Sequence, residues 1–139
     1  MIRVFSEEIK CMLNDTSNKN NFIYLYSINY WLRNTYLKEL VKEYQLKKLK
    51  VSIINSFELS DEMLNYVDND VDVLVIKDIN KLKLDHFSQN KLFLLLVKRI
   101  ESRKIIVITS NKAANKLKNI DSSLIKLLNI GKTLELKYN

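Results

Sequence analysis

Residues 71–79 read VDVLVIKDI and residues 104–110 read KIIVITS, and these two stretches decide the fold. Each is a short apolar run rich in Val and Ile, which is typical of a strand buried on both faces of a sheet. Between them, residues 85–102 are expected to form one long amphipathic helix. The side chains expected to be buried are Phe87, Phe93, Leu94, Val97 and Ile100. The order strand, helix, strand predicts a parallel pair of strands joined by a right-handed crossover.

The same alternation continues in both directions along the chain. Further strands are predicted at 21–27, 51–55 and 132–138, and further helices at 30–46, at 60–67 and at 115–130 with a break near Asp121. Residues 1–20 are an N-terminal segment with a short helix at 7–13 and a polar turn at 14–20. We therefore predict one domain over 1–139, whose core at 21–138 is a three-layer α/β/α sandwich with a doubly wound, parallel, five-stranded sheet.

The composition excludes several kinds of site. The 139 residues include one Gly, no Pro, one Cys and one His. A glycine-rich phosphate loop requires several glycines, so ordinary P-loop ATPase chemistry is disfavoured. A structural zinc site usually needs four Cys or His ligands, and Cys11 and His86 supply only two. We predict no metal and no cofactor. The single Cys and the lack of a long apolar run predict a cytoplasmic protein without a membrane segment.

Positive charge is concentrated in the last third of the chain. Residues 98–139 contain 10 Lys or Arg and 3 Asp or Glu, whereas residues 1–97 contain 13 of each. Such a region favours binding to nucleic acid through phosphate contacts, although a solvated lysine-rich face explains it equally well. The candidate DNA-binding residues are Lys112, Lys116, Lys118 and Lys126.

Four segments at the predicted strand ends carry a family resemblance. They are 25–37 (LYSINYWLRNTYL), 74–79 (LVIKDI), 107–111 (VITSN) and 123–127 (SLIKL). In this order the chain resembles the AAA+ ATPase core. It is most similar to the bacterial replication group, which comprises the DnaA initiator, the Hda-type regulators and the DnaC/DnaI/IstB helicase loaders. The resemblance covers residues 20–138 and implies the P-loop NTPase fold without the lid domain of that family.

The family's phosphate loop has the form LYG-x-x-G-x-GKT-x-L, and the matching segment here departs from it. Ser27, Tyr30 and Leu32 stand at the glycine positions, Arg33 at the lysine and Asn34 at the magnesium-binding hydroxyl. The resemblance therefore implies a degenerate site, because bulky side chains occupy space that the phosphates need. Tyr30, Trp31 and Tyr36 are expected to fill the vacated pocket, with a base-stacking patch beside Arg33 as the alternative.

The other motifs depart from the family in the same way. Lys77 stands where relatives hold the metal, and Asp78 matches their catalytic acid. These two neighbours are expected to form a structural ion pair. Asn111 matches the polar tip of the sensor-1 strand, and Lys126 lies at or next to the arginine that reaches a neighbouring subunit's nucleotide in relatives. The alternative is an unrelated α/β domain in which the acidic residue occurs by chance.

The function predicted from these features is non-catalytic. We expect a pseudo-ATPase that acts in DNA replication by protein binding, as an Hda-like or loader-like regulator of DnaA, the replicative helicase or the sliding clamp. Direct DNA binding through the basic third, and nucleotide binding without hydrolysis through Arg33, are the two alternatives. His86 is expected to be a solvent-exposed cap residue at a helix start. Cys11 has no basic or histidine partner nearby in the sequence that would activate it.

Overall fold

The computed structural model describes residues 5–15 and 21–137. Its elements, with η marking short 3₁₀ helices, are α1 (Ser6–Asn14), β1 (Phe22–Tyr26), α2 (Tyr30–Leu46), β2 (Val51–Asn55), η2 (Ser56–Glu58), η3 (Met63–Asn65), β3 (Val73–Lys77), η4 (Ile79–Lys81), α3 (His86–Glu101), β4 (Ile105–Ser110), η5 (Ala114–Lys116), α4 (Ser122–Leu128) and β5 (Lys132–Glu135). Within the described residues, no helix is long and apolar enough to cross a membrane.

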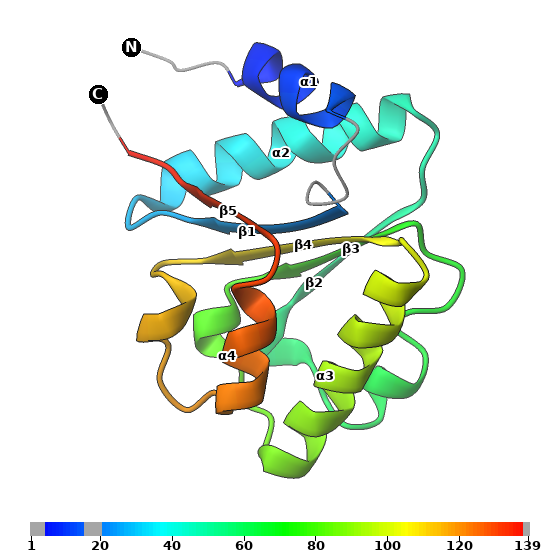
Figure 1. The fold of residues 1–139 in the computed structure, drawn as a ribbon, viewed down its shortest axis with the longest axis vertical. Coiled ribbons are helices and arrows are strands. Elements are labelled where there is room, and N and C mark those ends of the chain that lie inside the picture. Colours follow the sequence, from blue (N-terminus) through cyan, green and yellow to red (C-terminus); the bar gives the residue numbers. More distant parts are fainter. Residues whose placement is uncertain (1–4, 16–20, 138–139) are drawn as a thin grey trace.

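The five strands form one parallel sheet in the order β2-β3-β4-β1-β5. Helices α1 and α2 lie on one face, and α3 and α4 lie on the other (Figure 1). The predicted three-layer, doubly wound α/β architecture is confirmed. All four pairings are in parallel register, so the ends of β1, β3 and β4 lie along one edge of the sheet. The segments that follow these strands are therefore neighbours in space.

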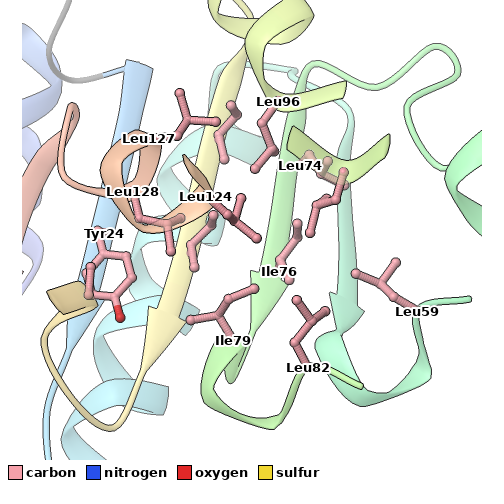
Figure 2. Close-up of a cluster of buried hydrophobic side chains, with 14 of the residues drawn as sticks. Tyr24, Leu59, Leu74, Ile76, Ile79, Leu82, Leu96, Leu124, Leu127 and Leu128 are labelled. Atoms are coloured by element: carbon pink, nitrogen blue, oxygen red, sulfur yellow. The ribbon is translucent and has the colours of Figure 1, made fainter. Parts of the chain in front are cut away.

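Alternate residues of the central strands supply two separate cores. Tyr24, Leu74 and Ile106 face α3 and α4, whereas Ile23 and Val75 face α1 and α2. Figure 2 shows the first core, in which side chains of α3 and α4 gather over the strands. Helices cover both faces of the sheet at β1, β3 and β4, so side chains pointing to either face are buried. This explains why these strands are continuous apolar runs and do not alternate between apolar and polar residues.

Two predicted helices differ in the structure. The expected helix at 60–67 is wrong. The segment forms the 3₁₀ helix η3, although the Ser60 hydroxyl accepts a hydrogen bond from the Met63 N–H at 3.2 Å as a cap does. The expected helix at 115–130 is confirmed only in its second half, as α4, which begins after Asp121, where the break was predicted. Parts of the predicted turn at 14–20 and strand at 132–138 lie outside the described residues.

The buried face of α3 matches the expected one only in part, because Phe93, Val97 and Ile100 are half-buried against the core. Phe87 and Leu94 are 70% and 57% exposed, so the prediction that they are buried is wrong. The buried positions are Ser88, Gln89, Leu92, Leu96 and Arg99. The Gln89 side-chain amide donates to the Leu84 and Asn119 carbonyls, and its oxygen accepts from the Asp121 N–H at 2.8 Å. These bonds fix the rotation of α3 and hold it against the segment that leads into α4.

Arg99 is a fully buried charged side chain that joins three segments. Its Nη1 donates to the Val71 carbonyl at 3.1 Å and also bonds the Asp68 carboxylate. Its Nη2 donates to the Asp72 carbonyl at 3.0 Å and to the Ile105 carbonyl at 2.7 Å. The guanidinium thus ties α3 to the segment before β3 and to the start of β4. Arg99 is one of the 10 Lys or Arg counted in residues 98–139, and its charge is consequently not on the surface.

The single glycine is required by a close approach between backbones. A Cβ atom on Gly131 would lie 2.4 Å from the Phe22 carbonyl oxygen and 2.8 Å from its ring. Real Cβ atoms do not come so close, so any side chain would push the start of β5 away from β1. Gly131 therefore serves the packing of β5 rather than any phosphate loop.

Candidate functional site

The site is built where β1, β3 and β4 end. Only Ser27, Ile28 and Asn29 connect β1 to α2, because the helix already begins at Tyr30. Asn29 caps this helix, since its Oδ1 accepts from the Leu32 N–H at 3.1 Å. Leu32 itself is fully buried in the core under α2. The segment that aligns with the family's phosphate loop is thus a tight connection followed directly by helix.

The backbone N–H groups of this connection are largely used within the protein. The Ser27 N–H donates to the Ser110 carbonyl at 3.2 Å, and the Asn29 N–H donates to the Ser27 hydroxyl at 3.1 Å. That hydroxyl in turn donates to the Leu136 carbonyl at 2.7 Å. An anion bound at a helix N-terminus needs free N–H groups that point at it. The N–H groups of Ser27 and Asn29 are not free, because they already have acceptors within the protein.

Arg33 points from α2 toward the end of β3 and is 6% exposed. Its Nη1 donates to the Ser27 carbonyl at 2.8 Å, and its Nη2 donates to the Asp78 Oδ1 at 3.2 Å. The Tyr30 ring lies over the guanidinium, with 5.2 Å between Cζ and the ring centroid. The arginine at the loop-lysine position is therefore occupied by an intramolecular salt bridge with the residue at the catalytic-acid position.

Asp78 is held from three sides in an unusual backbone conformation. Its N–H donates to the Thr109 hydroxyl at 3.0 Å, its carbonyl accepts from the Ser56 hydroxyl, and its carboxylate binds Arg33. Its φ and ψ are 56° and 58°, in the left-handed region that few residues other than Gly adopt. The contacts from α2, η2 and β4 stabilise this conformation. The position of the carboxylate is consequently well defined.

Lys77 does not pair with Asp78, so that prediction is wrong. Lys77 is half-buried and lines a pocket of about 390 Å³ with Tyr30, Asn34 and Ile53. It makes no ion pair among the described residues 5–15 and 21–137. The reason is geometric, because successive residues at the end of a strand point to opposite faces of the sheet.

The aromatic residues near Arg33 do not fill its surroundings as expected. Tyr30 and Trp31 are 59% and 43% exposed, and Tyr36 is buried on another side of α2 against Phe5, with 5.0 Å between ring centroids. The prediction of aromatic residues filling the pocket is wrong for all three. The space beside Asp78 is taken by the Arg33 guanidinium, and Tyr30 covers it from outside.

Asn111 lies near the β1–α2 connection. It lines a pocket of about 430 Å³ together with Ser27 and Asn29, and its N–H donates to the Asn80 side-chain oxygen at 3.2 Å. The Tyr24 hydroxyl donates to the Lys112 carbonyl at 2.8 Å, and burial raises the pKa of this side chain to about 12. This bond anchors the start of the β4–α4 segment.

The remaining candidate residues lie elsewhere. Lys116 and Lys118 are exposed on the β4–α4 segment, and Lys112 is half-buried there. Lys126 is exposed on α4 and lines a pocket between α3 and α4 that shares no residue with the Arg33–Asp78 pair. His86 is exposed, as predicted, and contacts Asp121, while Asp85 rather than His86 caps α3. Cys11 is exposed on α1.

Of the nine candidate nucleotide-site positions, Ser27, Arg33 and Asp78 are therefore joined by hydrogen bonds, and Tyr30 covers Arg33. Sequence reasoning did not single out four residues that support the site. Ser56 and Thr109 bond Asp78, Asn29 bonds the Ser27 hydroxyl, and Asn80 bonds the Asn111 N–H. A signal for them existed, since each is a small polar residue within three positions of the end of an apolar strand.

The family model for the bacterial DnaA ATPase domain matches residues 12–135 of this chain. The chain belongs to the DnaA ATPase domain family. It is thereby related to proteins that initiate DNA replication. The AAA+ resemblance predicted from the four motif segments is confirmed. The comparison with curated proteins gives no match.

Solved structures agree on the fold. DnaA from Aquifex aeolicus, in a structure with bound AMPPCP, aligns with a TM-score of 0.77 at 17% identity, covering 96% of this chain and 45% of that one. Domain III of the Thermotoga maritima replication initiation protein DnaA aligns with a TM-score of 0.74 at 22% identity, covering 99% and 64%. A DnaC helicase loader aligns with a TM-score of 0.63 at 14% identity, covering 99% and 93%. The chain thus spans less than half of the Aquifex DnaA chain.

Proposed function

We propose that this member of the DnaA ATPase domain family neither binds nor hydrolyses ATP and acts in replication initiation by binding another replication protein. The main support is the Arg33–Asp78 salt bridge. An arginine that remains bonded to Ser27 and Asp78 is not free to hold a phosphate, and an aspartate neutralised by it is a poor general base. The residues at this site do not fit a magnesium nucleotide.

The backbone of the β1–α2 connection supports the same proposal. The N–H groups of Ser27 and Asn29 in the connection, and of Leu32 in the first turn of α2, are satisfied within the protein. Asn34 stands where a hydroxyl would bind magnesium. Binding phosphates would require breaking several of these bonds at once. Each buried polar group left without a partner costs about 1–3 kcal/mol.

We expect ATP and ADP to leave the melting temperature of the purified chain unchanged. A ligand at a hundred times its Kd stabilises a protein by about 2.7 kcal/mol, which raises the melting temperature of a domain of this size by several degrees. Differential scanning fluorimetry with millimolar MgATP and a phosphate-release assay make the measurement. Asp78→Asn is the test variant, and Glu62→Gln, which changes an exposed acid away from this site, is its matched control.

The outcomes separate the alternatives. Phosphate release that Asp78→Asn abolishes and Glu62→Gln preserves would overturn the proposal. A nucleotide-dependent rise in melting temperature without turnover would instead favour nucleotide binding without hydrolysis.

The protein-binding half of the proposal is tested with defined partners. DnaA, the replicative helicase and the sliding clamp of the native host are each titrated against the immobilised chain, with and without ATP. We expect one of them to bind equally well in both conditions. An affinity pull-down analysed by mass spectrometry then identifies the partner. Absence of binding to all three purified proteins contradicts this half of the proposal and leaves the nucleotide result unaffected.

DNA binding is a second candidate function, supported by one surface feature. Lys112, Lys116 and Lys118 follow one another on the β4–α4 segment, and two of them are exposed. If they contact phosphates, the charge-reversed triple variant should bind DNA at least about tenfold more weakly, and the slope of log affinity against log salt should fall by roughly three. The control carries Lys38→Glu and Lys42→Glu on α2 and Lys47→Glu just after it, with the same net charge. Equal loss in both variants, or binding that salt does not weaken, rules out this site.

A further inference from the structure

Helices α3 and α4 leave an apolar groove between them on the surface. Phe93, Val97 and Ile100 of α3 form one wall, and Leu127 and Ile130 form the other. The three residues on α3 are three or four positions apart, so this wall is one face of the helix about two turns long. The other wall is the end of α4 at Leu127 together with Ile130, which follows the helix. We call this feature the α3–α4 groove. It is distinct from the Arg33–Asp78 pair and does not depend on whether nucleotide binds there.

The groove consists of two adjoining pockets of about 430 Å³ each, which share Ile100, Glu101 and Ile130. The second pocket continues past the end of α3 to Phe22 and Gly131, at the starts of β1 and β5. Ile130 on its rim is 65% exposed. A continuous apolar surface of this kind is unfavourable in water and commonly marks a binding site.

The shape of the groove fits a helix better than an extended strand. A groove between two helices accepts the apolar face of a third helix, whose anchors recur at i, i+3 or i+4, and i+7. The first pocket is lined by side chains of α3, of α4 and of the residues that follow α4, and the edge strand β5 is reached only at its start, beyond Gly131 in the second pocket. A strand would find no backbone partners along these helices.

The charges at the groove determine the character of the helix that binds. Lys126 lines the first pocket, and Arg103 and Lys104 line the second, whereas Glu101 is the single acid among the described lining residues of both. These cations are exposed at the rim. Rim charges select complementary partners and speed association. A second copy of this chain is disfavoured, because its net charge of +7 repels an identical molecule.

We propose that the α3–α4 groove docks an amphipathic α-helix of a partner protein that carries acidic residues on either side of its apolar face. The apolar anchors occupy the space between Val97 and Leu127. The acidic flanks lie against Lys126 at one end and against Arg103 and Lys104 at the other.

A helix-display library tests the proposal. Its members are helical peptides with four fixed apolar anchors and randomised flanking positions, selected against the whole chain. We expect the selected flanks to be rich in Asp and Glu. A synthetic selected peptide should bind Val97→Glu and Ile130→Glu about tenfold or more weakly than the unaltered chain, and Lys126→Glu should weaken binding in a salt-dependent manner. Lys42→Glu on α2 is the matched control and should bind normally.

Other outcomes overturn the proposal. Enrichment of basic or neutral flanks, or no enrichment above a parallel selection against Val97→Glu, contradicts an acidic helix.

Circular dichroism and the melting temperature of each variant establish that it is folded. If Val97→Glu does not fold, Ile130→Glu still tests the groove, because it changes a residue that is already exposed. A concentration-dependent dimer in analytical ultracentrifugation that Ile130→Glu abolishes would assign the groove to a second copy. Displacement of the peptide by a long-chain fatty acid with higher affinity would assign it to an amphiphile.

Discussion

Replacing Arg99 with Met should lower the free energy of unfolding by about 3–5 kcal/mol. Arg99 is fully buried, and its guanidinium satisfies the Val71, Asp72 and Ile105 carbonyls as well as the Asp68 carboxylate. A methionine fills similar volume but donates nothing, so these acceptors lose their partners at the starts of β3 and β4. Equilibrium unfolding in urea, followed by circular dichroism, measures the change.

Two further variants show whether the geometry of the guanidinium matters. Arg99→Lys keeps the charge but lacks the planar fork that reaches carbonyls on two segments, so it should recover only part of the loss. Arg103→Met removes an exposed arginine just beyond α3 and should change stability by no more than about 0.5 kcal/mol. The role assigned to Arg99 is wrong if Arg99→Met and Arg103→Met are equally stable.

The order of the elements could be predicted from sequence because the strands are short apolar runs between amphipathic segments. The rotation of α3 could not, because residues 92–97 read LFLLLV and leave no polar face from which to choose. Its buried face is set by polar contacts, those of Gln89 with the segment before α4 and those of Arg99 with β4. These contacts join residues far apart in the chain, and hydrophobic periodicity carries no information about them.

The candidate site was predictable only at the level of which residues stand at the strand ends. Arg33 and Asp78 were both identified, but their pairing was not, because they are 45 positions apart. Adjacency in sequence suggested Lys77 as the partner of Asp78, and the alternation of side chains at a strand end prevents that contact. Tyr30 and Trp31 were assigned to the interior because of their size, whereas the early start of α2 turns them outward.

The Arg33–Asp78 salt bridge should stabilise the folded chain, whereas residues kept for catalysis in a functioning ATPase site commonly do not. Both side chains are at most 10% exposed, so removing either one leaves the other buried without its partner. Arg33→Met and Asp78→Ala should each destabilise the chain by about 3–5 kcal/mol. The double variant should cost less than the sum of the two, with a coupling energy of about 0.5–3 kcal/mol, because no uncompensated charge remains.

The sign of the Asp78 effect decides between the two interpretations of this site. Residues kept for catalysis are commonly strained and unfavourable for stability, so their removal is neutral or stabilising while activity is lost. A carboxylate kept as the partner of a buried arginine has the opposite effect. Urea unfolding of the unaltered chain, both single variants and the double variant therefore gives a complete cycle. An Asp78→Ala variant as stable as the unaltered chain, or a coupling energy near zero, would mean that the salt bridge does not hold Arg33 and that the arginine remains available for a phosphate.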